Sequence, residues 1–443
     1  MAQAEDLDGK KGRVTFADIT TMHVGGRIGT FVEPINRAEL VQAVLQADAE
    51  GLPLCVVGGG SNILVGDQDF PGIVVRDARR EISILDEAAP TEKGQESIVH
   101  VEAQAGANWD DFVAYTIHMG LEGVEGLSGI PGTVGASVVQ NIGAYGQEVA
   151  TTVESVQAWD RSTGEVVILT KDQMDFGYRT SLLKKSMYQE EDRRRFFPTP
   201  RYVVISVTFA LRHSPTGVVG MGQLSKALQV EVGHRMPTGQ IRDAVLTVRA
   251  SKGMVEDPAR YGNPWMKGTK QKAQIQAAQA LAPTDPDLLH NRWSCGSFFV
   301  NPVLTVEQAA ELLPADAPRF NAPLPVPDSG FGFGSGPDSG PSSNSDSGPS
   351  SDSGSVAAKK GVKTSAAWLI DHAGFPKGFS LDGRAALSSQ HTLALTNHDH
   401  ASSADLLRLS QAIQAGVKKA FGVDLVPEPV FIGLSDAPED SAA

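Results

Sequence analysis

A run of three glycines lies between two strand-forming segments, and this placement limits the folds open to the chain. The apolar segment 54–57 is typical of a buried strand; it is followed by Gly58-Gly59-Gly60-Ser61-Asn62 and then by the strand-like segment 63–65. Glycines let a backbone turn tightly, so that successive N–H groups can bind a phosphate. A Rossmann site needs G-x-G-x-x-G at the start of a helix. Because this loop opens a strand, the sequence argues against a Rossmann NAD site, and an ordinary glycine turn stays an open alternative.

A second glycine-rich segment runs from Gly126 to Gly146 and has small side chains at almost every second or third position. Such a backbone can lie flat against a planar ring or a pyrophosphate. Its last part, Gln140-Asn141-Ile142-Gly143-Ala144-Tyr145-Gly146, adds amide groups that suit the polar edge of a ring. The composition favours a ligand cradle over a purely structural loop. Ser128 is not part of a G-x-S-x-G turn, so a hydrolase has no support.

Charge and composition exclude some classes of protein. A chain of 443 residues predicts two to four domains, at roughly 100–200 residues each. Its 38 Lys and Arg against 52 Asp and Glu give a formal net charge of −14, which argues against nucleic-acid binding through a general basic surface. The polar first residues are not expected to act as a signal peptide. The sequence has no apolar run near the ~20 residues that span a bilayer, and no metal-ligand spacing around Cys55 or Cys295. We therefore expect a cytoplasmic protein with reduced thiols, in which an anionic substrate meets a local cluster of cations.

Helix and strand signals are mixed along the chain and predict an α+β fold. Capping boxes at Asn36 and Thr305, and an N-cap at Asn108, mark three helix starts. Apolar periodicity predicts further helices near 241–248 and 403–420. Strands are expected at 31–32, 54–57, 63–65, 72–75, 98–101 and 202–209.

The tract from Pro327 to Gly361 is rich in Ser, Gly, Asp and Pro and has almost no apolar residues. It cannot bury enough surface to offset its conformational entropy, so it is predicted to be disordered. The pattern of the third unit continues beyond it, which indicates an insertion in a surface loop rather than a linker between domains. Long surface insertions cost little because closure entropy grows only logarithmically with length.

Three other segments carry single side chains of chemical interest. Arg179 ends Phe176-Gly177-Tyr178-Arg179, Ser297 follows a glycine and precedes two phenylalanines, and Glu428 lies between two prolines. Each has an ordinary alternative when taken alone: a solvated arginine, a strand entry with a core phenylalanine pair, and a surface turn. His398-Asp399-His400 has a spacing that is more typical of a solvated turn than of a metal site, so no metal is predicted.

Six segments occur in the order found in one family, and the match runs from about Phe16 to Gly433 apart from the insertion. The two segments Gln-Asn-Ile-Gly-Ala-Tyr-Gly and Gly-Ser-Phe-Phe are highly specific in combination. The chain resembles the UDP-N-acetylenolpyruvoylglucosamine reductases, the MurB family. The matching segments are Val57-Gly58-Gly59-Gly60-Ser61-Asn62, Gly129-Ile130-Pro131-Gly132-Thr133-Val134-Gly135, Gln140-Asn141-Ile142-Gly143-Ala144-Tyr145-Gly146, Phe176-Gly177-Tyr178-Arg179, Gly296-Ser297-Phe298-Phe299 and Pro427-Glu428-Pro429.

The resemblance implies a two-subdomain FAD-binding fold of the vanillyl-alcohol-oxidase (PCMH-like) type, followed by an α+β substrate-binding domain. It places the FAD-binding subdomains at 1–85 and 86–236, the substrate domain at 237–420 with the disordered insertion at 327–361, and a segment carrying the catalytic glutamate at 421–443. FAD is expected to bind tightly and non-covalently in the two glycine segments. The implied FAD-binding residues are Gly58, Gly59, Gly60, Ser61, Asn62, Gly129, Ile130, Pro131, Gly132, Gly135, Ala136, Ser137, Gln140, Asn141, Gly143, Ala144 and Tyr145.

The resemblance also implies an oxidoreductase with two half-reactions in one cleft. NADPH reduces FAD and leaves; the enolpyruvyl ether of UDP-N-acetylglucosamine is then reduced to UDP-N-acetylmuramate, a peptidoglycan precursor needed for cell shape and division. Hydride passes from flavin N5 to the terminal carbon, and negative charge develops on the neighbouring carbon. Arg179 and Glu428 would stabilise that charge, and Ser297 would protonate the carbon. Because a bare carboxylate would repel the charge, we expect a raised pKa for Glu428.

Further substrate contacts follow from the same match. Lys252 corresponds to a diphosphate-binding lysine, and Tyr178 and Asn301 correspond to residues that line the cleft. Family members with a substrate-closing loop usually have Tyr before Gly-Asp/Glu-Leu, whereas this chain has Met221-Gly222-Gln223-Leu224. The aromatic lid of those members is therefore not expected in the same form here.

Two other functions stay open on the residues. An FAD oxidase of the same broad fold, acting on another small alcohol or sugar, would not need Arg179, Ser297 and Glu428 together. Many such oxidases hold flavin covalently through His or Cys, and neither glycine segment contains His. A flavin- or nucleotide-binding module without catalysis would bind the cofactor and not be reduced by NADPH. For the reductase we expect a monomer whose partners are NADPH and the UDP-sugar enol ether, with no nucleic acid and no membrane insertion.

Overall fold

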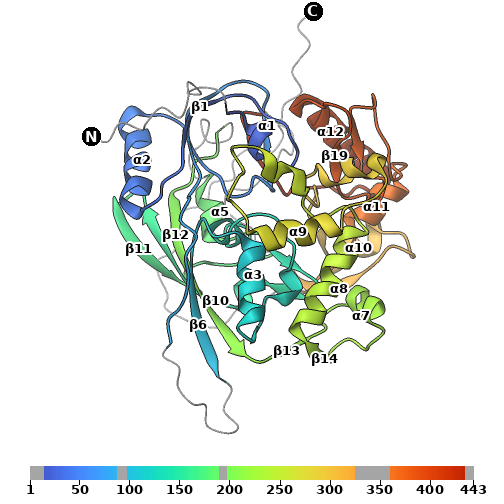
Figure 1. The fold of residues 1–443 in the computed structure, drawn as a ribbon. Helices are drawn as coiled ribbons and strands as arrows, with labels where there is room; N and C mark the ends of the chain where they lie inside the picture. The colour runs from blue at the N-terminus through green and yellow to red at the C-terminus, as the bar shows by residue number, and fades with distance from the viewer. Residues whose placement is uncertain (1–13, 87–96, 189–196, 325–359, 435–443) are drawn as a thin grey trace, which may run out of the picture.

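A computed structural model describes residues 14–86, 97–188, 197–324 and 360–434 (Figure 1). The first elements form a three-stranded parallel sheet in the order β1-β4-β2. Leu40 and Val44 on α2 are fully buried in the apolar cluster that also contains residues of β2 and β4. The elements of this unit are α1 (Phe16–Ile19), β1 (Ile28–Val32), α2 (Arg37–Glu50), β2 (Leu54–Val56), β3 (Ile63–Val65) and β4 (Phe70–Val75).

The ends of α2 follow the predicted signals. The Asn36 side chain accepts a hydrogen bond from the N–H of Glu39, and Gly51 ends the helix in the left-handed region, at φ 64°. The Glu39 carboxylate accepts from the N–H of Ile35 at 3.0 Å instead of closing the second half of the capping box on Asn36. The predicted helix start is therefore confirmed, with a different partner for the glutamate.

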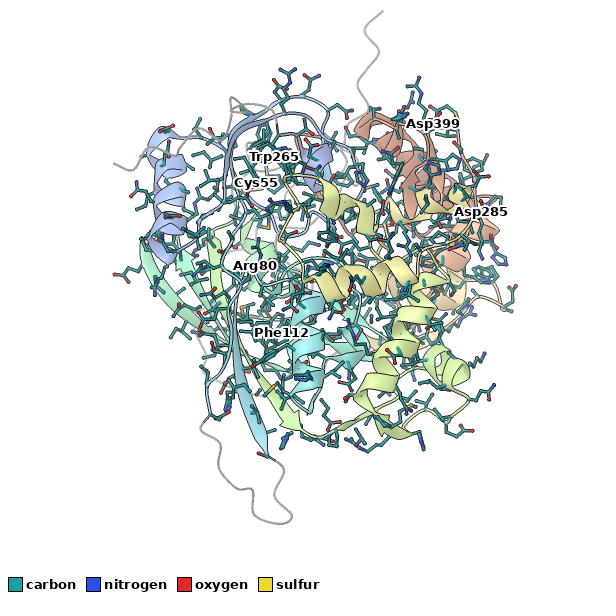
Figure 2. The ribbon with its side chains drawn as sticks, viewed as in Figure 1. Cys55, Arg80, Phe112, Trp265, Asp285 and Asp399 are labelled. Carbon is teal, nitrogen blue, oxygen red and sulfur yellow. The ribbon has the colours of Figure 1, made fainter. Side chains whose placement is uncertain are left out.

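A six-stranded antiparallel sheet forms the second unit, in the order β11-β10-β12-β6-β5, with β7 beside β12. Helix α3 packs on it through Phe112, whose ring centroid lies 4.5 Å from that of Phe209 on β12 (Figure 2). The strands and helix are β5 (Ile82–Ile84), β6 (Ile98–Gln104), α3 (Trp109–His118), β7 (Leu121–Glu122), β10 (Val153–Asp160), β11 (Glu165–Thr170) and β12 (Tyr202–His213).

Short elements between β7 and β10 carry the second glycine segment. A longer irregular region, with α8 as its main helix, joins the sheet to the C-terminal part. The elements between β7 and β10 are η1 (Glu125–Leu127), α4 (Val134–Ser137), β8 (Gly143–Ala144), β9 (Gln147–Glu148) and η2 (Val149–Thr151). The short helix α5 (Leu182–Ser186) lies between β11 and β12. The joining region contains β13 (Thr216–Val218), α7 (Gly222–Leu228), β14 (Arg235–Pro237), α8 (Thr238–Ala250), η3 (Pro258–Gly262), α9 (Lys272–Ala280) and η4 (Pro286–Arg292).

The C-terminal part is built around α12, whose predicted apolar residues Leu406, Leu409, Ile413 and Val417 are fully buried in one core. A capping box at Ser402 starts this helix, and the predicted capping box at Thr305 starts α10. The elements are β15 (Val303–Thr305), α10 (Val306–Leu312), β16 (Phe320–Pro323), β17 (Lys360–Lys363), α11 (Ala366–His372), β18 (Ala385–Leu387), β19 (Leu395–Asn397), α12 (Ser403–Phe421) and β20 (Val430–Ile432).

Two features differ from the organisation expected from sequence. Residues 327–359 of the predicted insertion lie outside the described residues, but Lys360 and Gly361 are part of β17, which pairs with both β15 and β16. The predicted C-terminal limit of the insertion is therefore wrong, because sheet pairing continues upstream of the apolar pattern. In addition, β20 pairs in parallel with β3, which joins the C-terminal segment to the first glycine loop. Within the described ranges, no helix has the length and apolar character that crossing a bilayer requires.

Candidate active site

A cavity of about 470 Å³ lies where the two glycine segments meet. This volume is in the range typical of small-molecule and cofactor sites. Arg179, Ser297 and Glu428 all line it, although they come from three distant parts of the chain. The structure thus brings together the three residues that the resemblance singled out.

The two glycine segments touch each other directly at the cavity wall. The Ser61 hydroxyl donates to the carbonyl oxygen of Pro131 at 2.8 Å. A Cβ on Gly59 would lie 2.8 Å from the Cα of Gly132, and one on Gly58 would lie 2.6 Å from Oγ1 of Thr133. Side chains at these positions would force the segments apart, so glycine is required by close approach and not by flexibility alone.

Most of the predicted FAD-binding residues line this cavity, and Gly129 and Asn141 do not. Gly129 turns its N–H away to Oδ1 of Asp110, at 2.7 Å. The Asn141 side chain is used inside the fold, where it accepts from the N–H of Ala150 at 3.0 Å. The lining residues from the prediction are Gly58, Gly59, Gly60, Ser61, Asn62, Ile130, Pro131, Gly132, Gly135, Ala136, Ser137, Gln140, Gly143, Ala144 and Tyr145.

Arg179 is held at the wall by backbone groups. Its φ of 59° lies in the left-handed region, which is uncommon for a non-glycine residue. Its guanidinium donates to the carbonyl oxygens of Gly143 at 2.7 Å and Asn141 at 3.3 Å. These contacts fix the cation, and its Nε lies 3.3 Å from Oε1 of Glu428.

Glu428 occupies a buried position with polar partners on several sides. Its carboxylate accepts from the side-chain amide of Gln140 at 3.0 Å, and its backbone carbonyl accepts from Nζ of Lys184 at 3.1 Å. Burial raises the pKa of this carboxyl group, and the charges of Arg179 and Lys184 oppose the increase. The direction expected from sequence is confirmed.

Ser297 is placed by the residues on either side of it. Gly296 has a φ of 78°, and a Cβ there would meet no atom within 4 Å, so the wall is open beside the serine. Phe298 and Phe299 are buried in the C-terminal core, with 0% and 1% of their surface exposed. The two rings anchor the segment, and the hydroxyl-bearing residue is left at the cavity wall.

The predicted substrate residues fall into two groups. Lys252 lines the cavity, and its ammonium donates to Oε1 of Gln223 at 2.7 Å. Gln223 and Met221, both from the segment that departs from the family pattern, also line the cavity. Tyr178 and Asn301 do not line it: they contact each other at 3.5 Å, and the Tyr178 ring lies 5.3 Å from Cζ of Arg179. Tyr178 therefore lies beside the arginine, and Asn301 contacts Tyr178.

Some cavity residues were not assigned a role from sequence. Burial lowers the pKa of Lys184 to about 8, with Glu428 opposing the decrease. Burial, together with the charges of Lys252 and Lys377, lowers the pKa of His391 to about 4. Lys184 comes soon after Arg179 in the sequence, which is a weak signal for a second cation at the site, whereas His391 has no distinctive local pattern.

The residues present fit FAD with its anionic diphosphate. The cavity combines close-packed glycine backbone, which can present N–H groups to phosphate, with an apolar wall that suits a flat ring. Cations gather here against the overall charge of −14. The cationic residues at the wall are Arg179, Lys184, Arg249, Lys252 and Arg292.

Comparisons with known proteins show the family of the chain. Residues 29–170 match a model for an FAD binding domain, and residues 287–432 match a model for the C-terminal domain of UDP-N-acetylenolpyruvoylglucosamine reductase. The chain is 37% identical over 423 residues to the UDP-N-acetylenolpyruvoylglucosamine reductase of Thermobifida fusca (strain YX), which covers 95% of this chain and 98% of that one. It is 38% identical over 422 residues to the reductase of Streptomyces coelicolor, covering 95% and 89%. Among solved structures, the MurB of Thermus caldophilus aligns with 21% identity and a TM-score of 0.49, over 95% of this chain and 97% of that one. The chain belongs to the UDP-N-acetylenolpyruvoylglucosamine reductase family.

Proposed function

We propose that Arg179, Ser297 and Glu428 act together in the reaction of the family: reduction of the enolpyruvyl ether of UDP-N-acetylglucosamine to UDP-N-acetylmuramate in peptidoglycan precursor synthesis. NADPH is the electron donor, and bound FAD supplies hydride transfer to the terminal carbon of the enol ether. The observation that carries the proposal is the meeting of the three side chains on the wall of one cavity beside both glycine segments.

Each of the three residues has a distinct task. Arg179, fixed by two backbone carbonyls, places a cation where negative charge develops on the carbon next to the hydride acceptor and on its carboxylate. Glu428 can assist in its protonated form, and its raised pKa favours that form. Ser297 donates the proton that completes addition of hydride and proton across the double bond. A serine is a weak acid, but the enolate is a strong enough base to accept from it.

Lys252 is proposed to bind the diphosphate of the UDP-sugar, because it is a cavity cation whose present partner is a neutral amide. In this proposal Tyr178 supports Arg179 from outside the cavity lining, and Asn301 holds Tyr178. We further propose that the protein acts as a cytoplasmic monomer, since NADPH and UDP-sugars are cytoplasmic metabolites and all three reacting side chains come from one chain.

An anaerobic experiment in two steps tests the function. The purified holoenzyme is mixed with NADPH, and the visible absorbance of the flavin is expected to disappear. Addition of the UDP-sugar enol ether should then restore it, with formation of one UDP-N-acetylmuramate per flavin. Flavin that NADPH fails to bleach would contradict the proposal and favour a binding module. Flavin that is bleached but restored only by oxygen would favour an oxidase.

A further inference from the structure

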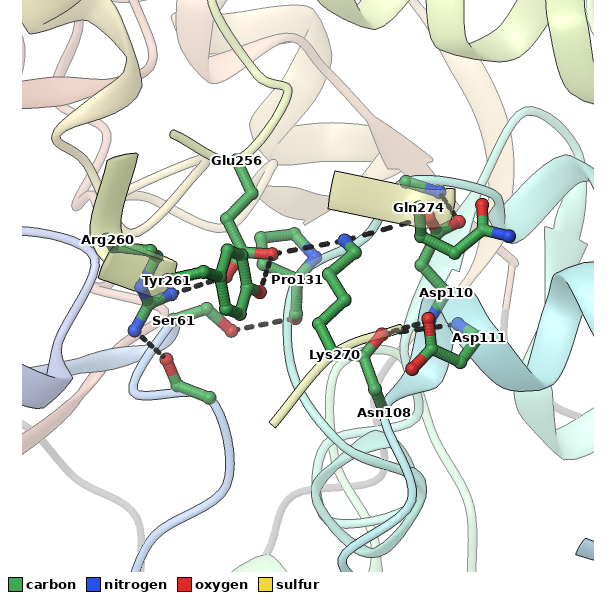
Figure 3. A network of polar contacts seen from close by, with 12 residues as sticks. Ser61, Asn108, Asp110, Asp111, Pro131, Glu256, Arg260, Tyr261, Lys270 and Gln274 are labelled. Carbon is green, nitrogen blue, oxygen red and sulfur yellow. Dashed lines mark hydrogen bonds and ion pairs between the residues drawn. The ribbon is translucent and has the colours of Figure 1, made fainter. Parts of the chain in front are cut away.

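A group of charged side chains is buried beside the two glycine segments, and of its members only Glu256 lines the cavity. Asp110, Arg242, Glu256, Arg260 and Lys270, here called the buried ion network, each expose less than a tenth of their surface. Buried charges are costly unless they are paired, so their partners show what the network holds in place. Figure 3 shows Arg260, Glu256, Lys270 and Asp110 following one another across this region.

At one end, the network holds the first glycine segment. The Arg260 guanidinium donates to the carbonyl oxygens of Gly59 and Ile19, each at 2.9 Å, and pairs with the carboxylate of Glu256. A Cβ on Gly60 would lie 2.4 Å from the Ile19 oxygen. Arg260 thus binds the backbone on both sides of the close contact between Ile19 and Gly60, where a larger side chain would clash.

In the middle, Glu256 joins two residues of the segment that follows it. Its Oε2 accepts from the hydroxyl of Tyr261 at 2.5 Å and from Nζ of Lys270 at 3.3 Å. Although burial alone would raise the pKa of Glu256, the charges of Lys270 and Arg260 hold it below its usual range. The carboxylate is therefore ionised and links the two cations.

At the other end, the network holds the second glycine segment. Lys270 lies 3.7 Å from Oδ2 of Asp110, which also pairs with Arg242 at 2.6 Å. Oδ1 of Asp110 accepts from the N–H of Gly129 at 2.7 Å. A continuous path of ion pairs and hydrogen bonds thus runs from the carbonyl of Gly59 to the N–H of Gly129.

This path has a consequence for anion binding at the cavity. A trans peptide points its carbonyl and the following N–H in opposite directions. With the carbonyl of Gly59 bonded to Arg260, the N–H of Gly60 points away from Arg260, and Gly60 lines the cavity.

We propose that the buried ion network positions the two glycine segments for the diphosphate of FAD. Arg260 and Asp110 are positioning residues, since each acts on a glycine backbone and not on the ligand itself. The proposal deepens the flavin site and concerns retention of the cofactor, so it can fail while the reductase reaction stands.

The test is the rate at which the holoenzyme releases FAD. Release is followed by the rise of flavin fluorescence after dilution, together with the thermal unfolding temperature, for Arg260→Gln and Arg260→Lys. Arg235→Gln is the matched control, because Arg235 pairs with the buried Glu122 at 2.6 Å and neither residue lines the cavity. Arg260→Gln is expected to release FAD at least tenfold faster than wild type, and the release rate of Arg260→Lys is expected to lie between those two. The release rate of Arg235→Gln is expected to stay within twofold of wild type, even if its unfolding temperature falls as much as that of Arg260→Gln.

A wild-type release rate in Arg260→Gln overturns the proposal, and so does equal acceleration in Arg235→Gln. If Arg260→Gln does not fold, Arg260→Lys decides in the same way, because it keeps the charge and loses the paired carbonyl bonds. A double variant supplies a second readout: if Arg260 and Asp110 act through one network, Arg260→Lys with Asp110→Asn accelerates release less than the product of the two single effects. Independent, multiplicative effects would contradict a shared network.

Discussion

The guanidinium of Arg179 faces the carboxylate of Glu428 across the cavity wall, with 3.3 Å between Nε and Oε1. Both groups are largely buried, and the arginine reaches this position through its bonds to the carbonyls of Gly143 and Asn141. The contact joins the second glycine segment to the C-terminal part of the chain. A fixed cation therefore lies in contact with a carboxyl group whose pKa is raised.

Replacing Arg179 by Lys is expected to slow reduction of the UDP-sugar by roughly 10- to 100-fold, about 1.4 to 2.7 kcal/mol of barrier. A lysine keeps the charge but cannot bond both carbonyls while facing Glu428. Stopped-flow measurement of flavin reoxidation by the sugar enol ether checks this, with Arg235→Lys as the control. Wild-type reoxidation in Arg179→Lys would show that charge alone suffices.

Replacing Ser297 by Ala should separate the two half-reactions. Flavin reduction by NADPH is expected to stay within twofold of wild type, while reoxidation by the sugar slows by roughly 100- to 10,000-fold, as for loss of a general acid. Cys295→Ala is a close control, because this buried thiol lies on the same wall. Equal loss in both half-reactions would rule out the proton-donor role of Ser297.

Replacing Lys252 by Met is expected to raise KM for the UDP-sugar by roughly 10- to 100-fold. This corresponds to the loss of one charge-assisted hydrogen bond, which contributes about 1.5–3 kcal/mol. The change in kcat should be smaller, because the diphosphate is remote from the reacting carbons. Steady-state kinetics give both constants. Lys226→Met, at a position on α7 that does not line the cavity, serves as the control. An effect on kcat with KM unchanged would place Lys252 elsewhere in the reaction.

Replacing Asp111 by Asn is expected to stabilise the protein at neutral and alkaline pH. Burial raises the pKa of Asp111 to about 6, and its Oδ1 has no hydrogen-bond partner among the described residues. Because the folded pKa lies above the unfolded value, ionisation costs stability as pH rises from about 4 to 6, and the full cost stays above that. Thermal unfolding should show a gain of up to about 2–3 kcal/mol at pH 8 that shrinks toward pH 5.

Asp110 provides the opposite case beside it. Burial opposes its ionisation, but Lys270 and Arg242 hold its pKa below the usual range, so Asp110→Asn should destabilise the protein at pH 8. If Asp111→Asn and Asp110→Asn shift the unfolding temperature in the same direction, the assigned charge states are wrong.

Local sequence patterns predicted those helices whose first residues carry a capping signal. Asn36, Asn108 and Thr305 each cap the helix that they were expected to start. Glycines that must approach another backbone, such as Gly59, were also visible as an unusual run. These features depend on neighbouring residues, and a sequence shows neighbours directly.

The features that escaped prediction depend on contacts between distant segments. Nothing in the local sequence distinguishes Gly129 from the other small residues of its segment. Only the hydrogen bond from its N–H to Asp110 shows that it faces away from the cavity. Lys360 joins a sheet because Pro323 on β16 pairs with it, and β15 pairs with the same strand from Gly361 onward. The buried ion network could not be found from spacing, because Asp110 and Glu256 are ordinary acidic residues until the fold encloses them.

The parallel pairing of β20 with β3 also bears on how the protein is made in the cell. The strand that follows the first glycine loop, β3, can pair only after β20 has been synthesised, and Glu428 lies just before β20 in the sequence. The chain must therefore be synthesised at least as far as Ile432 before β3 can pair with β20. A polypeptide that ends upstream of Val430 lacks this strand, so only chains that extend through β20 can complete the pairing beside the first glycine loop.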